Sequence, residues 1–129
     1  MDEAGGIAAH KALYKTYIDA WNRLDLDTYC SLFAFPLAIG GGGRAPEIIP
    51  DLAAWRARTK ANLDELAARG WANSVIDPLH VGLMAGDTGI ITVEYSRFAH
   101  DGSLIEGGTS NYLTRKLDGE WKIVGVVVP

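Results

Sequence analysis

Near residue 70 the spacing of apolar residues changes from a helical period to a strand period, and this change limits the folds open to the chain. Leu13, Tyr17, Trp21 and Leu24 lie on one face of a helix predicted over residues 7–23. From Trp71 onward, short apolar runs and alternating patterns predict strands. Helices first and strands last are typical of an α+β fold, with helices packed on one face of a curved antiparallel sheet.

Capping and turn residues set the boundaries of these elements. An aspartate in the segment 25–27 can cap a second helix, and a third helix is expected between the N-cap Asp51 and Gly70. Asp101-Gly102 and Asp118-Gly119 are two-residue sequences that favour hairpin turns. The predicted helices cover residues 7–23, 26–33 and 51–70, and the predicted strands cover residues 35–39, 71–76, 79–84, 88–99, 103–116 and 120–128.

Size and charge narrow the class of protein. The 129 residues fit one domain, residues 1–129. A net charge of −4 without a basic block predicts binding to neither nucleic acid nor an anionic membrane. Cys30 is the one cysteine, so no internal disulfide is possible. Because no stretch reads as a signal peptide or a membrane span, we expect a cytoplasmic protein.

Four consecutive glycines, Gly40–Gly43, interrupt the first half of the chain. Such a run makes a flexible connection or lets the backbone approach another group closely. It lacks the lysine and the serine or threonine of a phosphate-binding loop, and no helix follows it at once. The run therefore does not predict phosphate binding, and its role stays open at this point.

Two segments resemble a known superfamily. One is Tyr17–Asp27, with the sequence YIDAWNRLDLD, followed by Leu32–Ala34; the other is Tyr112–Ile123, which ends in DGEWKI. They resemble the opening and the closing hairpin of the nuclear transport factor 2-like superfamily, which includes SnoaL-like and ketosteroid-isomerase-like branches. The resemblance implies a cone-shaped, cystatin-like fold, in which a strongly bent antiparallel sheet wraps around helices and a pocket opens at the wide end, usually in a homodimer. Members include isomerases, cyclases, dehydratases and binding proteins, so function has to be argued from the site.

Side-chain alternation predicts which residues face the pocket. If Asp118-Gly119 is a two-residue turn, Leu117 pairs with Glu120 and Asn111 shares a face with the valines of the last strand. The resemblance places those valines inside the cone, and Asn111 with them. The opposite face would carry Tyr112, Trp121 and Ile123, through which we predict a homodimer.

The hairpin predicted over residues 88–116 fits this assignment of faces only if one of its strands contains a bulge. A turn at Asp101-Gly102 pairs Arg97 with Glu106, which puts Tyr95 and Arg97 out of phase with Asn111. One extra residue restores the phase, and Gly107-Gly108 is a natural place for a bulge. We therefore predict a bulge there, with Tyr95 and Arg97 inside.

Three residues are candidates for catalysis. Tyr17 stands where the resemblance places an oxyanion-hole tyrosine, although an amphipathic core tyrosine explains it equally. Asn111 corresponds to a second hydrogen-bond donor, but the position of the carboxylate base falls on Gly41, which cannot abstract a proton. Steroid isomerisation by that mechanism is therefore not expected. His80 is the best remaining base from its intrinsic pKa, with a surface or core histidine as the alternative.

Binding residues are expected at the mouth and walls of the pocket. Arg97 could hold a carboxylate or an enolate, and a salt bridge to Glu106 across the hairpin is the equal alternative. The aromatic walls predicted for the pocket are Trp21, Trp55 and Tyr95. His10, His80 and His100 are too scattered to predict a metal site, and we expect no cofactor.

These residues predict a protein that binds a small, mostly apolar organic molecule carrying a carbonyl or a carboxylate. If it is an enzyme, the expected chemistry is cofactor-free isomerisation, cyclisation or dehydration of a carbonyl compound. The alternative is a non-catalytic ligand sensor or a dimeric interaction domain, which the missing base favours.

Overall fold

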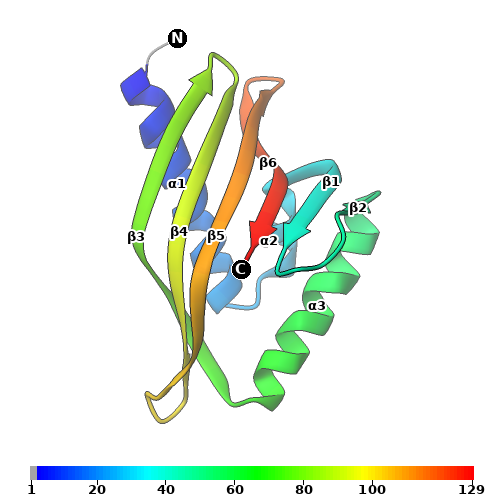
Figure 1. Ribbon diagram of the computed structural model, residues 1–129, viewed down its shortest axis with the longest axis vertical. Coiled ribbons are helices and arrows are strands. Elements are labelled where there is room, and N and C mark those ends of the chain that lie inside the picture. The colour runs from blue at the N-terminus through cyan, green and yellow to red at the C-terminus, as the bar shows by residue number, and fades with distance from the viewer. Residues whose placement is uncertain (1–2) are drawn as a thin grey trace.

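Helices cover one face of a curved six-stranded sheet in the computed structural model, which describes residues 3–129 (Figure 1). Helix α1 crosses behind the long strands β3 to β5, and α3 lies beside the short strands β1 and β2. No helix of this part of the chain is long and apolar enough to cross a membrane. The elements are α1 (Glu3–Asn22), α2 (Leu26–Ser31), β1 (Phe33–Gly41), β2 (Glu47–Ile49), α3 (Leu52–Ala68), β3 (Trp71–Ala85), β4 (Thr88–Ala99), β5 (Leu104–Leu117) and β6 (Glu120–Val128).

The helix starts follow the predicted caps. The Asp25 carboxylate accepts a hydrogen bond from the Thr28 amide at 3.2 Å and begins α2. The Asp51 carboxylate accepts one from the Ala54 amide at 2.9 Å and begins α3. Each cap satisfies a backbone donor that has no partner within its helix.

The sheet is mixed, where the sequence predicted an antiparallel one. Its strand order is β2-β1-β6-β5-β4-β3, and every neighbouring pair is antiparallel except β1 and β6, which run parallel. Hairpin turns signal antiparallel pairs locally, whereas a parallel pair joins strands that are distant in sequence. The two strands predicted over 71–76 and 79–84 form the single strand β3, with a register shift between Ile76 and Leu79.

The register of β6 overturns the predicted placement of Asn111. Leu117 pairs with Glu120 as expected, but Val124 is an extra residue between the pairs Thr114–Ile123 and Leu113–Gly125. This bulge reverses the alternation beyond it, because one inserted residue turns every later side chain to the other face. Tyr112 and Ile123 consequently lie in the core, and Asn111 lies on the outer face.

The bulge predicted at Gly107-Gly108 is also wrong. The ladder between β4 and β5 continues unbroken through residues 106–109, and its irregularity lies between Arg97 and Phe98. The extra residue that reverses the alternation at Asn111 is therefore Val124 of β6, whereas the extra residue of β5 is Ile105, close to the turn. Tyr95 and Arg97 do face inward, as predicted.

A buried histidine fastens α1 to β5. His10 is fully buried; its Nδ1 lies 2.7 Å from the Gly6 carbonyl oxygen and its Nε2 lies 2.7 Å from Thr114 Oγ1. A carbonyl only accepts, so in the neutral ring Nδ1 carries the hydrogen and Nε2 accepts from the threonine hydroxyl. The Trp121 ring packs on His10 at 4.4 Å between ring centroids. Trp121 thus lies against α1 and not on the outer face, where it was predicted.

Candidate functional site

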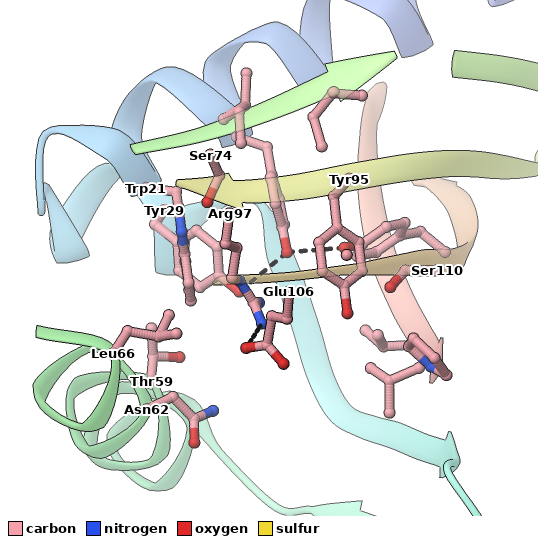
Figure 2. Close-up of a pocket in the computed structure, with 18 of the residues that line it drawn as sticks. Trp21, Tyr29, Thr59, Asn62, Leu66, Ser74, Tyr95, Arg97, Glu106 and Ser110 are labelled. Atoms are coloured by element: carbon pink, nitrogen blue, oxygen red, sulfur yellow. Dashed lines mark hydrogen bonds and ion pairs between the residues drawn. The ribbon is translucent and has the colours of Figure 1, made fainter. Parts of the chain in front are cut away.

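A cavity of about 470 Å³ lies between the helices and the inner face of the sheet (Figure 2). This volume is within the range of small-molecule sites. Among the residues predicted from the sequence, five line it and two do not. The five are Tyr17, Trp21, Trp55, Tyr95 and Arg97.

The other two, His80 and Asn111, lie on the outer face of the sheet. His80 pairs with Thr92, and Thr92 pairs with Asn111, so all three share that face. The Thr92 hydroxyl donates to Asn111 Oδ1 at 2.7 Å, and His80 is exposed. The register shift between Ile76 and Leu79 turns His80 outward, as the β6 bulge turns Asn111 outward. Neither residue can act on a molecule inside the cavity.

Four tyrosines bring their hydroxyls together on the cavity wall, and we call them the tyrosine cluster. The Tyr14 hydroxyl donates to Tyr112 Oη at 3.1 Å. Tyr17 Oη lies 3.0 Å from Tyr112 Oη and 3.3 Å from Tyr29 Oη. The members come from three elements, and all four are buried. They are Tyr14 and Tyr17 of α1, Tyr29 of α2 and Tyr112 of β5.

The tyrosine cluster has more hydroxyl protons than hydrogen bonds between its members. Four hydroxyls carry four protons, and three hydrogen bonds join them, so one proton is left over. Since Tyr14 donates to Tyr112, the remaining proton belongs to another member of this group. Each of those members lines the cavity, so the cluster presents one unused O–H donor to it.

Burial keeps these phenols protonated. It raises the pKa of Tyr14 and Tyr17 well above the ordinary value, and it raises the pKa of Tyr29 and Tyr112 as well. Neutral hydroxyls can donate a hydrogen bond to a ligand oxygen and stabilise negative charge that develops on it. They cannot take a proton from a ligand at neutral pH, so the cluster is a donor site.

Arg97 forms the salt bridge that was one of the two predicted alternatives, and it also lies at the cavity wall. Its guanidinium donates to Glu106 Oε1 at 3.1 Å, which is the predicted salt bridge across the hairpin. It also lines the cavity, with Cζ 4.7 Å from the centroid of the Tyr95 ring and 5.8 Å from that of Trp21. Figure 2 shows Arg97 between Trp21 and Glu106, next to Tyr29. Cation–π contact with two rings holds the charge at the wall.

The sequence analysis missed Tyr14, Tyr29 and Tyr112 as members of the site. Tyr14 and Tyr17 are three residues apart and share a helix face, a signal that the sequence does carry. Tyr29 lies in a helix of only six residues, which is too short to show a periodic signal. Tyr112 was assigned to the outer face, because the bulge at Val124 of β6 was not predicted.

A helical layer, a curved mixed sheet and a cavity between them define a class of cone-shaped α+β proteins. A family model described as NTF2-like protein (DUF6841) matches residues 8–129, and the chain belongs to this family. The resemblance noted in the sequence is thereby confirmed. A search of curated proteins found none that matches.

Solved structures with the same fold cover almost the whole chain. An NTF-2 like protein of unknown function from Shewanella oneidensis MR-1 is 17% identical, with a TM-score of 0.77, over 95% of this chain and 98% of that one. Aln2 from a Streptomyces species is 10% identical, with a TM-score of 0.78, over 99% and 92%. A ketosteroid isomerase-like protein from Erwinia carotovora atroseptica is 14% identical, with a TM-score of 0.72, over 94% and 92%. At these identities the likeness shows the fold alone.

Proposed function

We propose that this chain binds a small, mostly apolar organic molecule in the cavity, with a carbonyl or carboxylate oxygen of the ligand on the tyrosine cluster. The observation that carries the proposal is the unused hydroxyl donor of that cluster, which lies in a cavity of ligand size. A buried donor without an acceptor is costly, and a ligand oxygen supplies the acceptor. The rings of Trp21, Trp55 and Tyr95 give the carbon body of the ligand apolar surface to contact.

Binding without turnover fits these residues better than proton transfer. The same donor would stabilise an enolate, but enolisation also needs a base at the substrate carbon. The carboxylates among the described lining residues are Glu65, which is exposed, and Glu106, which is paired with arginines. No histidine is among those lining residues. The non-catalytic ligand sensor is therefore the function that we favour.

A matched pair of ligands tests the proposal. We expect 2-acetylnaphthalene to bind about fivefold more tightly than 2-isopropylnaphthalene in equilibrium dialysis, because one buried hydrogen bond contributes about 1 kcal/mol. The two molecules have similar shapes, and the hydrocarbon is the more apolar one. Hydrophobic partition alone would reverse the order, so tighter binding of the hydrocarbon, or no binding of either compound, contradicts the proposal.

Tyr→Phe variants test whether the hydrogen-bond donor to the ligand belongs to the tyrosine cluster. Replacing all four tyrosines of the cluster by Phe removes every hydroxyl of the cluster, and we expect it to abolish the preference for the ketone. Tyr14→Phe is the control, because three hydroxyls and two contacts still leave one proton unused. Circular dichroism checks that each variant is folded. If the variant without all four hydroxyls keeps the full preference, the oxygen of the ligand lies elsewhere.

We also propose that two copies associate through the outer face of the sheet, using residues other than those predicted from the sequence. Tyr112 and Ile123 are buried, whereas Leu113 and Val127 are 40% and 51% exposed on the outer face. Apolar side chains exposed on neighbouring strands favour self-association. We expect sedimentation equilibrium to give a dimer at micromolar concentration and Val127→Lys to shift it to monomer. A monomeric wild type at that concentration would overturn this.

A further inference from the structure

Two guanidinium groups share a single carboxylate oxygen at the wall of the cavity. Glu106 Oε1 accepts from Arg97 at 3.1 Å and from Arg69 at 2.9 Å. All three side chains line the cavity. With two positive charges and one negative charge, this ion cluster has a net charge of +1.

Most of the hydrogen-bonding capacity of Arg97 is unused. Within the described residues its side chain makes one hydrogen bond, to Glu106, although a guanidinium carries five N–H donors. The side chain is 25% exposed, so water reaches only part of it. A planar guanidinium fork that is held against aromatic rings is suited to pair with a carboxylate through two parallel bonds.

Arg97 also lies next to the tyrosine cluster. Burial raises the pKa of Tyr29 and of Tyr112, and the positive charge of Arg97 opposes part of that rise for both. Figure 2 shows the guanidinium close to Tyr29. A ligand carboxylate at this corner of the cavity would meet a cation and a neutral O–H donor together, one for each of its oxygens.

We propose that the ligand is an organic carboxylate with an apolar body, and that its carboxylate takes the place of Glu106 on Arg97. This inference rests on the proposed function and names the charge of the ligand. In the exchange Glu106 stays paired with Arg69, so no charge is left without a partner. The ion cluster goes from +1 to neutral when the anion binds. Glu106 thus competes with the ligand and sets its affinity.

Acid and amide pairs of the same shape test the charge. The probes are 2-naphthoate with 2-naphthamide, and decanoate with decanamide, measured by equilibrium dialysis at low salt. We expect each acid that binds to do so at least about tenfold more tightly than its amide. Raising the salt concentration should weaken binding of the acid and leave the amide unchanged, a readout that needs no variant.

Glu106 and Arg97 variants test the exchange. Glu106→Gln removes the competing charge, and we expect it to raise the affinity for the acid about fivefold without changing the affinity for the amide. Glu65→Gln is the matched control, because Glu65 lines the same cavity and has no ion pair within the described residues. It should change the affinity for the acid by less than about twofold. Arg97→Gln should make acid and amide bind equally.

The outcomes separate this inference from the proposed function. If acids and amides bind equally, or if Glu106→Gln and Glu65→Gln act alike, the exchange at Arg97 is wrong and ligand binding stands. If no acid or amide binds while 2-acetylnaphthalene does, the carboxylate inference alone fails. If none of these compounds binds, the proposed function fails as well.

Discussion

Above pH 10 the free energy of unfolding is expected to fall by about 5 kcal/mol per pH unit, because unfolding exposes four buried phenols that then ionise. Burial raises the pKa of every member of the tyrosine cluster in the folded state, whereas an unfolded tyrosine has a pKa of about 10. Above pH 10 the unfolded state therefore binds fewer protons than the folded state. Stability from this source is fully present below pH 10 and is lost as the pH rises, by about 1.4 kcal/mol per unit for each tyrosine.

Urea unfolding between pH 8 and pH 11.5 measures this slope. Tyr17→Phe should reduce it by about a quarter, because one of the four phenols is removed. Tyr95→Phe, which lies outside the cluster, is the control and should leave this contribution in place. Absorbance at 295 nm gives an independent readout, since the four phenols should ionise together with unfolding. Ionisation of the cluster near pH 10 in a protein that stays folded would contradict the prediction.

Local sequence signals predicted the elements of this fold well. The caps at Asp25 and Asp51 and the turn at Asp118-Gly119 lie where expected, because each depends on a few neighbouring residues. The parallel pairing of β1 with β6 was not predicted, because it joins segments that are distant along the chain. The short strand β2 was missed as well, since three residues carry no periodic signal.

The candidate site could be predicted in part. Trp21, Tyr95 and Arg97 line the cavity as predicted, because Trp21 lies on a helical stripe and the expected pair of Arg97 with Glu106 is present in the ladder of β4 and β5. Asn111 was not, because residues 123–128 of β6 are valines, an isoleucine and a glycine, which show no alternation that would locate a bulge. The proton count of the tyrosine cluster depends on distances between three elements, and only the folded structure supplies them.

A substitution in the glycine run Gly40–Gly43 is expected to cause the second large loss of stability. Gly41→Ala is expected to cost about 3–4 kcal/mol of stability, through overpacking and backbone strain together. Gly41 pairs with Val128 in the parallel ladder of β1 and β6, and its φ is +94°. A Cβ added there would fall on the carbonyl oxygen of Val128 and lie 3.0 Å from its backbone nitrogen. The obstruction is backbone held in a sheet, so it cannot rotate aside as a side chain would.

Two neighbouring glycines are matched controls for this variant. Gly43→Ala adds a Cβ in open space at a φ of +70°, so left-handed backbone strain of about 1 kcal/mol is the expected cost. Gly40→Ala meets no atom within 4 Å and has no positive φ, so its effect should stay within about 0.5 kcal/mol. Urea unfolding of the three variants measures these losses of stability, and we expect the largest at Gly41 and the smallest at Gly40. Equal costs at Gly41 and Gly43 would show that strain alone matters, whereas the predicted gap assigns Gly41 to the close approach of β1 and β6. None of Gly40–Gly43 is among the described residues that line the cavity, and the close approaches within the run are those of Gly41 to Val128 and of Gly42 to Pro129.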